Sequence, residues 1–170
     1  MKSLFFIMAL AIFFISLVFF LQDIRKDYHC TKLAVLVGSL HEGLSQAKTP
    51  MMKQMLVNNA MPPLFAEKRK FTNLLGYWPT IFNGYTQAAT VANLNTNYSE
   101  SAELLLKAIH YHPFLANAFD GLGKILIKTG FAQYAQHCSK FSQAVLKGTG
   151  ISHLDRQQCI EAVKKLLSGV

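Results

Sequence analysis

The side chains with the clearest potential for chemistry are two closely spaced pairs, His110 with His112 and His137 with Cys138. On a helix, residues two apart point about 200° away from each other, whereas the ligands of one metal ion need a spacing of three or four. The first pair is therefore interpreted as polar residues at a helix end, beside Pro113. The chain has no glycine-rich phosphate loop, H-E-x-x-H motif or nucleophile elbow. We expect no enzyme, no metal site and no cofactor.

Two further cysteines could form a disulfide. Cys138 and Cys159 lie at nearly equal distances on either side of a Gly148-Thr149-Gly150 turn, so two antiparallel helices joined there would bring them level. Helix axes are usually about 8–10 Å apart, however, and a disulfide needs Cα atoms closer than about 7 Å. Two buried thiols are the first expectation, and a disulfide in an oxidising compartment is the alternative. Cys30 would remain unpaired.

The elements that position these residues start with an apolar segment at residues 4–21, in which only Ser16 is not apolar. The apolar core of a signal peptide has about 7–15 residues and is followed by a small-residue cleavage site, which is missing here. As a helix the segment spans roughly 27 Å, close to the bilayer's hydrocarbon core of about 30 Å. We expect a retained single-pass transmembrane helix that contacts lipid through residues 4–21.

Two rules disagree about the orientation of this helix. Lys2 precedes the segment, while Arg25, Lys26 and Lys32 follow it, and the positive-inside rule then favours a cytoplasmic C-terminal domain. A very short lead before one apolar helix is instead the layout of a signal-anchor that exports its domain. We prefer the second interpretation, with the domain on the extracytoplasmic (periplasmic) side.

The rest of the chain has helical periodicity and no sustained alternation of period two, which predicts an all-α fold. An apolar stripe extends the first helix towards Pro50; its members are Leu33, Leu36, Val37, Leu40, Leu44 and Ala47. Further helices are expected at about 51–59, 66–76, 82–94, 100–110, 116–129, 132–146 and 152–167. The first two of these are divided by Met61-Pro62-Pro63.

A 34-residue period relates residues of similar type. The pairs with this spacing are Pro79 and Pro113, Tyr85 and Phe119, Phe71 and Leu105, Leu74 and Ala108, and Leu75 and Ile109. One helix reads Phe119-x-x-Leu122-Gly123-x-x-Leu126, and the equivalent helix before it reads Tyr85-x-x-Ala88-Ala89-x-x-Ala92. This pattern resembles the tetratricopeptide repeat family, whose unit is a helix pair of 34 residues. Small residues at 88, 89 and 123 would let paired helices approach closely.

The resemblance covers residues 82–146 well and residues 48–81 poorly. After Ala135 the expected aromatic position holds Ser139, and Phe141 and Ala144 come two places late. The earlier segment keeps the pattern only on its second helix, because its first helix is rich in methionine. An unrelated helical bundle is the alternative fold.

Together these features divide the chain into five parts. They are a membrane anchor at 1–22, an amphipathic connecting helix at 23–49, a degenerate helical pair at 50–81, two repeats at 82–150 and a capping helix at 151–170. The resemblance implies an all-α protein with an N-terminal transmembrane helix and an α-solenoid of two to three helix pairs. The last helix would cover the apolar end that a stacked array otherwise exposes.

Members of this family bind an extended peptide or a helix of a partner protein on a concave surface lined by first helices. The resemblance assigns this groove to eight polar residues: Asn83, Thr86, Thr90, Asn93, Asn117, Asp120, Lys124 and Lys128. Amides suit a peptide backbone because they both donate and accept, and the two lysines could together hold an acidic group. A solvated polar face without a ligand is the alternative. The carboxylate clamp of the family is not matched, because Thr86 and Thr90 occupy its first positions.

The sequence thus predicts a membrane-tethered module that recruits or assembles a protein partner. The alternative is a structural subunit of a larger membrane complex, in which the anchor and a methionine-rich segment (Met51, Met52, Met55 and Met61) pack on neighbours. The basic excess, 17 Lys and Arg against 9 Asp and Glu, fits an acidic partner or anionic headgroups facing Lys48, Lys53 and Lys68-Arg69-Lys70. No nucleic acid is expected, because the basic residues are scattered and no binding motif accompanies them.

Overall fold

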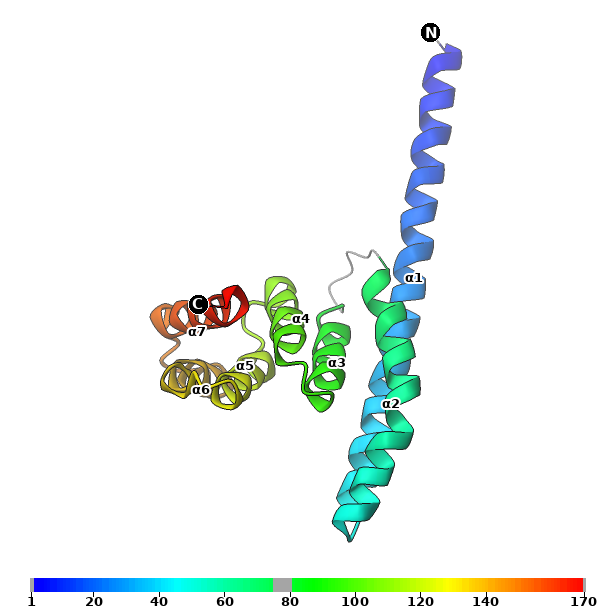
Figure 1. Ribbon diagram of the computed structural model, residues 1–170. Coiled ribbons are helices and arrows are strands. Elements are labelled where there is room, and N and C mark those ends of the chain that lie inside the picture. The colour runs from blue at the N-terminus through cyan, green and yellow to red at the C-terminus, as the bar shows by residue number, and fades with distance from the viewer. Residues whose placement is uncertain (1, 75–80, 170) are drawn as a thin grey trace.

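The computed structural model describes residues 2–74 and 81–169, which form seven α-helices and no strand (Figure 1). The helices are α1 (Lys2–Gln46), α2 (Pro50–Asn73), α3 (Ile81–Leu94), α4 (Tyr98–Tyr111), α5 (Ala116–Lys128), α6 (Ala132–Lys147) and α7 (His153–Ser168). The all-α prediction is therefore confirmed for this part of the chain. Leu75 and Pro79, which belong to the predicted period, lie outside the described residues.

Helix α1 is a single helix of 45 residues that carries both predicted N-terminal parts. All side chains from residue 7 to residue 21 are exposed, and this helix is long and apolar enough to cross a bilayer. Beyond residue 21 one stripe of α1 faces inward and buries Cys30, Leu33 and Leu40. The expected continuity between the anchor and the amphipathic helix, which ends before Pro50, is confirmed.

Helix α2 contradicts the predicted break at Met61-Pro62-Pro63, since it continues through both prolines. Each proline removes one backbone donor from the helix, which normally destabilises it. Packing offsets this loss, because Leu64, Glu67 and Phe71 are buried in the following turns, where α2 lies against α1 and α3. Residues 50–73 are thus one long helix antiparallel to the second half of α1, not a pair of short helices.

The next two helix pairs, α3 with α4 and α5 with α6, are in contact through small residues. In the first pair the Ser101 hydroxyl donates a hydrogen bond of 2.8 Å to the carbonyl oxygen of Ala89, and both residues are buried. In the second pair, a Cβ at Gly123 would lie 3.4 Å from the carbonyl oxygen of Ala135. Positions 89 and 123 are equivalent in the 34-residue period, so a small residue at the same position allows the helices of both pairs to pack closely.

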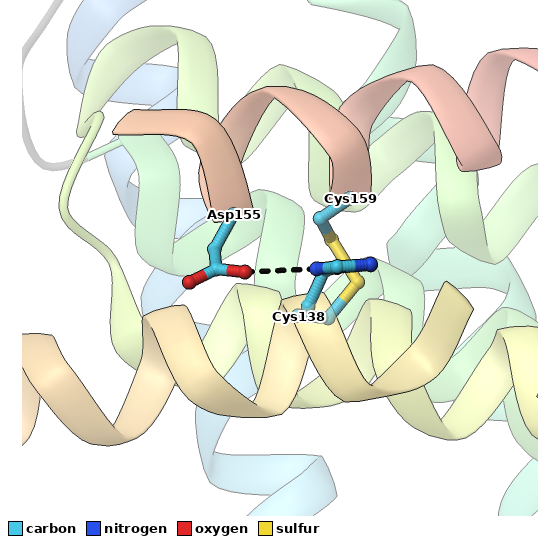
Figure 2. Close-up of a disulfide and its surroundings, with 4 residues drawn as sticks. Cys138, Asp155 and Cys159 are labelled. Atoms are coloured by element: carbon cyan, nitrogen blue, oxygen red, sulfur yellow. Dashed lines mark hydrogen bonds and ion pairs between the residues drawn. A yellow bond between two sulfur atoms is a disulfide. The ribbon is translucent and has the colours of Figure 1, made fainter. Parts of the chain in front are cut away.

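Helix α7 packs on α6, α5 and α4 and is covalently joined to α6. Cys138 and Cys159 form a disulfide with a Cα to Cα distance of 5.0 Å (Figure 2). The first expectation, two free thiols, is therefore wrong. It assumed an ordinary axis spacing, but Ala135 and Ala162 lie one turn from the two cysteines on the same faces and are buried, and alanine allows closer packing. Next to the disulfide, His137 Nδ1 lies 2.8 Å from Asp155 Oδ1 (Figure 2).

Candidate functional site

A cleft with a volume of about 250 Å³ opens among α3, α4 and α5. Its lining residues are Thr86, Gln87, Ala89, Thr90, Asn93, Ser101, Leu105, Asn117, Gly121, Lys124 and Ile125. Five of the eight predicted groove residues are among them, three from α3 and two from α5. The structure therefore brings residues of both predicted repeats into one cavity. The other three, Asn83, Asp120 and Lys128, do not line it.

The floor of the cleft is apolar or internally satisfied. Ala89, Leu105 and Ile125 are buried, and the hydroxyl of Ser101 is already bonded to the Ala89 carbonyl. Gly121 lies where a Cβ would come within 2.9 Å of Leu105 Cδ1. A larger residue at this position would have to displace that leucine, so glycine keeps α5 close to α4 at the base of the cleft.

The cleft walls carry groups that suit a peptide backbone. Thr86 and Thr90 donate their hydroxyl protons to carbonyl oxygens one turn earlier, at 2.8 and 3.0 Å, which leaves their lone pairs free to accept. The amides of Gln87 and Asn117 have no hydrogen-bond partner among the described residues, and each offers two donors and an acceptor. Sequence reasoning missed Gln87, because it projected only the family's groove positions.

Lys124, which lines the cleft, and Lys128, which does not, fail to form the joint anion site that their spacing suggests. Lys124 Nζ lies 2.7 Å from Asp120 Oδ2, and both side chains are exposed. Lys128 Nζ lies 3.4 Å from Asn93 Oδ1 and 5.3 Å from the centre of the Tyr98 ring. An exposed ion pair contributes only about 0–1 kcal/mol, so Lys124 can exchange Asp120 for a carboxylate of a ligand. Lys128 instead connects α5 with residues of α3 and α4.

Two residues of the basic run 68–70, Lys68 and Lys70, have carboxylate partners within the protein. Lys68 Nζ lies 2.8 Å from both carboxylate oxygens of Glu100, and Lys70 Nζ lies 3.8 Å from Glu67 Oε2. Lys48 and Lys53 flank the turn between α1 and α2. At the rise of a helix this turn lies roughly 40 Å from residue 21, where the apolar segment ends. These residues therefore do not form one basic surface beside the apolar segment of α1.

A buried carboxylate lies where α1 meets α2. Glu67 is 3% exposed, accepts a hydrogen bond from the His29 ring and lies 3.6 Å from Lys32 Nζ. Burial raises the pKa of Glu67, but the His29 hydrogen bond and the nearby positive charges outweigh it, so the pKa lies below its ordinary value. The glutamate thus remains ionised and holds the two helices together.

A buried lysine lies nearby, between α1, α2 and α3. Lys26 Nζ donates to the carbonyl oxygen of Leu74 at 2.6 Å and lies 5.1 Å from the centre of the Phe71 ring and 5.2 Å from that of Tyr85. Burial lowers the pKa of Lys26, while the charge of Asp23 opposes that shift. Sequence reasoning missed this role, although Lys26 continues the inward stripe of Cys30 and Leu33 by one helical turn.

In the part of the chain that the structure describes, no three His, Cys, Asp or Glu side chains are grouped so that they could hold a metal ion. His110 and His112 both lie at the C-terminal end of α4, where His112 is the capping residue. The cleft among α3, α4 and α5 is accordingly the candidate functional site. Compared with protein-family models, with curated proteins and with solved structures, the chain matches none.

Proposed function

We propose that this chain is a membrane-tethered, tetratricopeptide-like interaction module that binds an extended segment of a partner protein in the cleft among α3, α4 and α5. The observation that carries the proposal is the convergence of five predicted groove residues on one cleft: Thr86, Thr90, Asn93, Asn117 and Lys124. Unpaired amides and threonine acceptors on the walls are suited to a peptide backbone. The volume of about 250 Å³ accommodates a few residues rather than a folded domain.

We further propose that the helical domain lies on the extracytoplasmic side of the membrane. The Cys138–Cys159 disulfide supports this orientation, because disulfides persist in oxidising compartments and are rare where thiols are kept reduced. The partner would then be an exported protein or the exported part of a membrane protein.

The direct test is site-specific photo-crosslinking in the native membrane. A photoreactive phenylalanine analogue replaces Thr90 on the cleft wall. In the matched control the same analogue replaces Gln133, an exposed residue of α6. We expect one discrete crosslinked protein from Thr90 and none from Gln133. The same product should disappear when Asn117→Trp fills the cleft, since a tryptophan side chain occupies most of the space that a bound peptide needs.

The alternative, a structural subunit without an occupied groove, gives a different result. In that case crosslinks would form from Met55, which is 54% exposed at the start of α2, and from the anchor, while Thr90 would give none. Charge reversal separates two modes of binding in the cleft. If Lys124→Glu abolishes capture while Lys128→Glu does not, the partner contributes a carboxylate to Lys124; if neither variant affects it, recognition depends on the amides.

A further inference from the structure

Helix α1 carries a second apolar stripe on the face that points away from the other helices. The stripe is defined beyond the apolar segment by Ile24, Tyr28 and Val35, with the polar Thr31 between the last two. Towards the N-terminus it continues through Leu10, Phe14, Leu17 and Leu21, in a segment that is apolar on almost every face. The spacings alternate between four and three residues throughout. This is the 3.5-residue period by which helices form coiled coils.

The exposure of these residues shows that nothing in the described chain covers the stripe. Ile24 is 50% exposed, Tyr28 60% and Val35 61%, whereas Cys30 and Leu33 on the opposite face are buried against the domain. In Figure 1, α2 lies along the second half of α1 and α3 lies to the left of this pair, and no helix lies to its right. Lipid does not cover the whole stripe, because Val35 lies about 21 Å along the helix from residue 21, where the apolar segment ends.

We propose that a second copy of this chain covers the stripe, so that two α1 helices form a parallel coiled coil from the membrane to about residue 38. Two copies inserted in one orientation can only place their anchors parallel and at the same depth. The membrane therefore sets the register that the continuous stripe requires. No such constraint would align a soluble partner with the part of the stripe inside the bilayer.

The charges that flank the stripe complement each other in this arrangement. In a parallel two-stranded coiled coil, the residue that immediately precedes the first core position of a heptad lies close to a residue of the other helix whose number is five higher. Asp27 and Lys32 have this spacing and opposite charges, so two interchain ion pairs form by symmetry. Asp27 is exposed and has no ion pair among the described residues, and Lys32 is 47% exposed beside Glu67. Gly38, next in the stripe, has no atom near its Cβ position and allows the helices to separate or cross there.

Cysteine crosslinking of the full chain in membranes tests this proposal. Cys30→Ala removes the only free thiol of the described chain, and single cysteines are introduced at Tyr28, Thr31 and Val35, with Gln133→Cys on exposed α6 as the control. After mild oxidation we expect disulfide-linked dimers of twice the chain mass from the three stripe positions and none from the control. Equal crosslinking at all four positions, or a product that contains a different protein, would overturn the proposal.

A matched pair of charge substitutions provides a second test that does not depend on oxidation. Val35→Asp places a carboxylate in the stripe, whereas Ser39→Asp places it one turn further on, beside the stripe. Because both side chains are exposed, neither change should alter the helical content measured by circular dichroism. We expect Val35→Asp to weaken dimerisation in detergent by roughly tenfold or more and Ser39→Asp by far less, as measured by sedimentation. Equal effects of the two variants would contradict a dimer through this face.

The dimer and the cleft are independent of each other. The coiled coil uses the face of α1 that lies opposite α2 and α3, while the cleft lies among α3, α4 and α5. Loss of dimer with retained capture of a partner, or the reverse, would therefore identify which of the two proposals has failed.

Discussion

Gly84 allows α3 to approach Phe71 of α2 closely. A Cβ at this position would lie 2.3 Å from Cε2 and Cζ of Phe71 and 3.0 Å from Cys30 Sγ. Phe71 is fully buried and its ring packs edge-on against Tyr85, so it has little room to move. We expect Gly84→Ala to lower the free energy of unfolding by about 1–3 kcal/mol, the usual effect of overpacking, in guanidinium titrations of the detergent-solubilised chain.

Gly43→Ala is the matched control for this prediction. Gly43 also lies within a helix, but the nearest atom to its Cβ position, Leu56 Cδ1, is 3.6 Å away, an ordinary contact. Alanine there should increase the free energy of unfolding by up to about 1 kcal/mol through helix propensity alone. If both variants had the same effect, the close contact at Gly84 would not constrain the fold.

Glu67 should make stability depend on pH in the acid range. Its pKa is lower in the folded state than in the unfolded chain, so its contribution is fully present above the unfolded value of about 4.3 and is lost as the pH falls through the folded-state pKa. Glu67→Gln should therefore lower the free energy of unfolding at neutral pH by about 1–3 kcal/mol. The difference from wild type should shrink as the pH falls below about 4.

The control for the pH experiment is Glu103→Gln. Glu103 lies exposed on α4 and forms no ion pair among the described residues. Titrations with denaturant at several pH values should find little change for this variant. A difference for Glu67→Gln that stayed constant down to pH ~3 would mean that the ionised carboxylate does not join α1 to α2.

At the level of elements, the disulfide joins α7 covalently to α6. It closes a loop with a sequence separation of 21, for which the chain-entropy model gives about 3 kcal/mol. Reduction should therefore lower the free energy of unfolding by about 2–4 kcal/mol and speed hydrogen exchange in α7 before exchange in α3. The same reductant should leave a Cys138→Ala/Cys159→Ala variant unchanged. Equal acceleration in α3 and α7 would mean that the bond stabilises the whole array.

The order of the helices could be predicted more reliably than the positions at which each helix ends. The stripe that begins at Leu33 correctly indicated one helix that continues from the apolar segment, because a 3.6-residue apolar period depends on local order alone. The interpretation of Pro62 and Pro63 as a break failed for the opposite reason. Contacts with α1 and α3, which are distant in sequence, keep the helix continuous past the two missing donors.

For the whole molecule, an extracytoplasmic domain makes a prediction about thiols in cells. The chain has three cysteines. After acid quenching and denaturation, a maleimide polymer should label only Cys30, and prior reduction should allow it to label all three. Gel mobility counts the labels directly. Three labels before reduction would place the domain in a reducing compartment and contradict the proposed orientation.

The candidate site was predictable in part. The groove positions implied by the family resemblance included Thr86, Thr90, Asn93, Asn117 and Lys124, which line one cleft in the structure. It did not predict that Asn83 and Asp120 lie outside the cleft or that Lys128 pairs with Asn93, since side-chain partners depend on the neighbouring helices.

The sequence by itself determined the long apolar helix near the N-terminus, the all-α content and the small residues by which helix pairs approach, because all three follow from composition and local periodicity. Only the tertiary structure decided that Lys26 and Glu67 are buried, that Cys138 reaches Cys159 and that one stripe of α1 faces inward while another is left exposed. These outcomes depend on distances between segments that are remote in the chain. Such distances arise from the packing of whole helices, which no local pattern specifies.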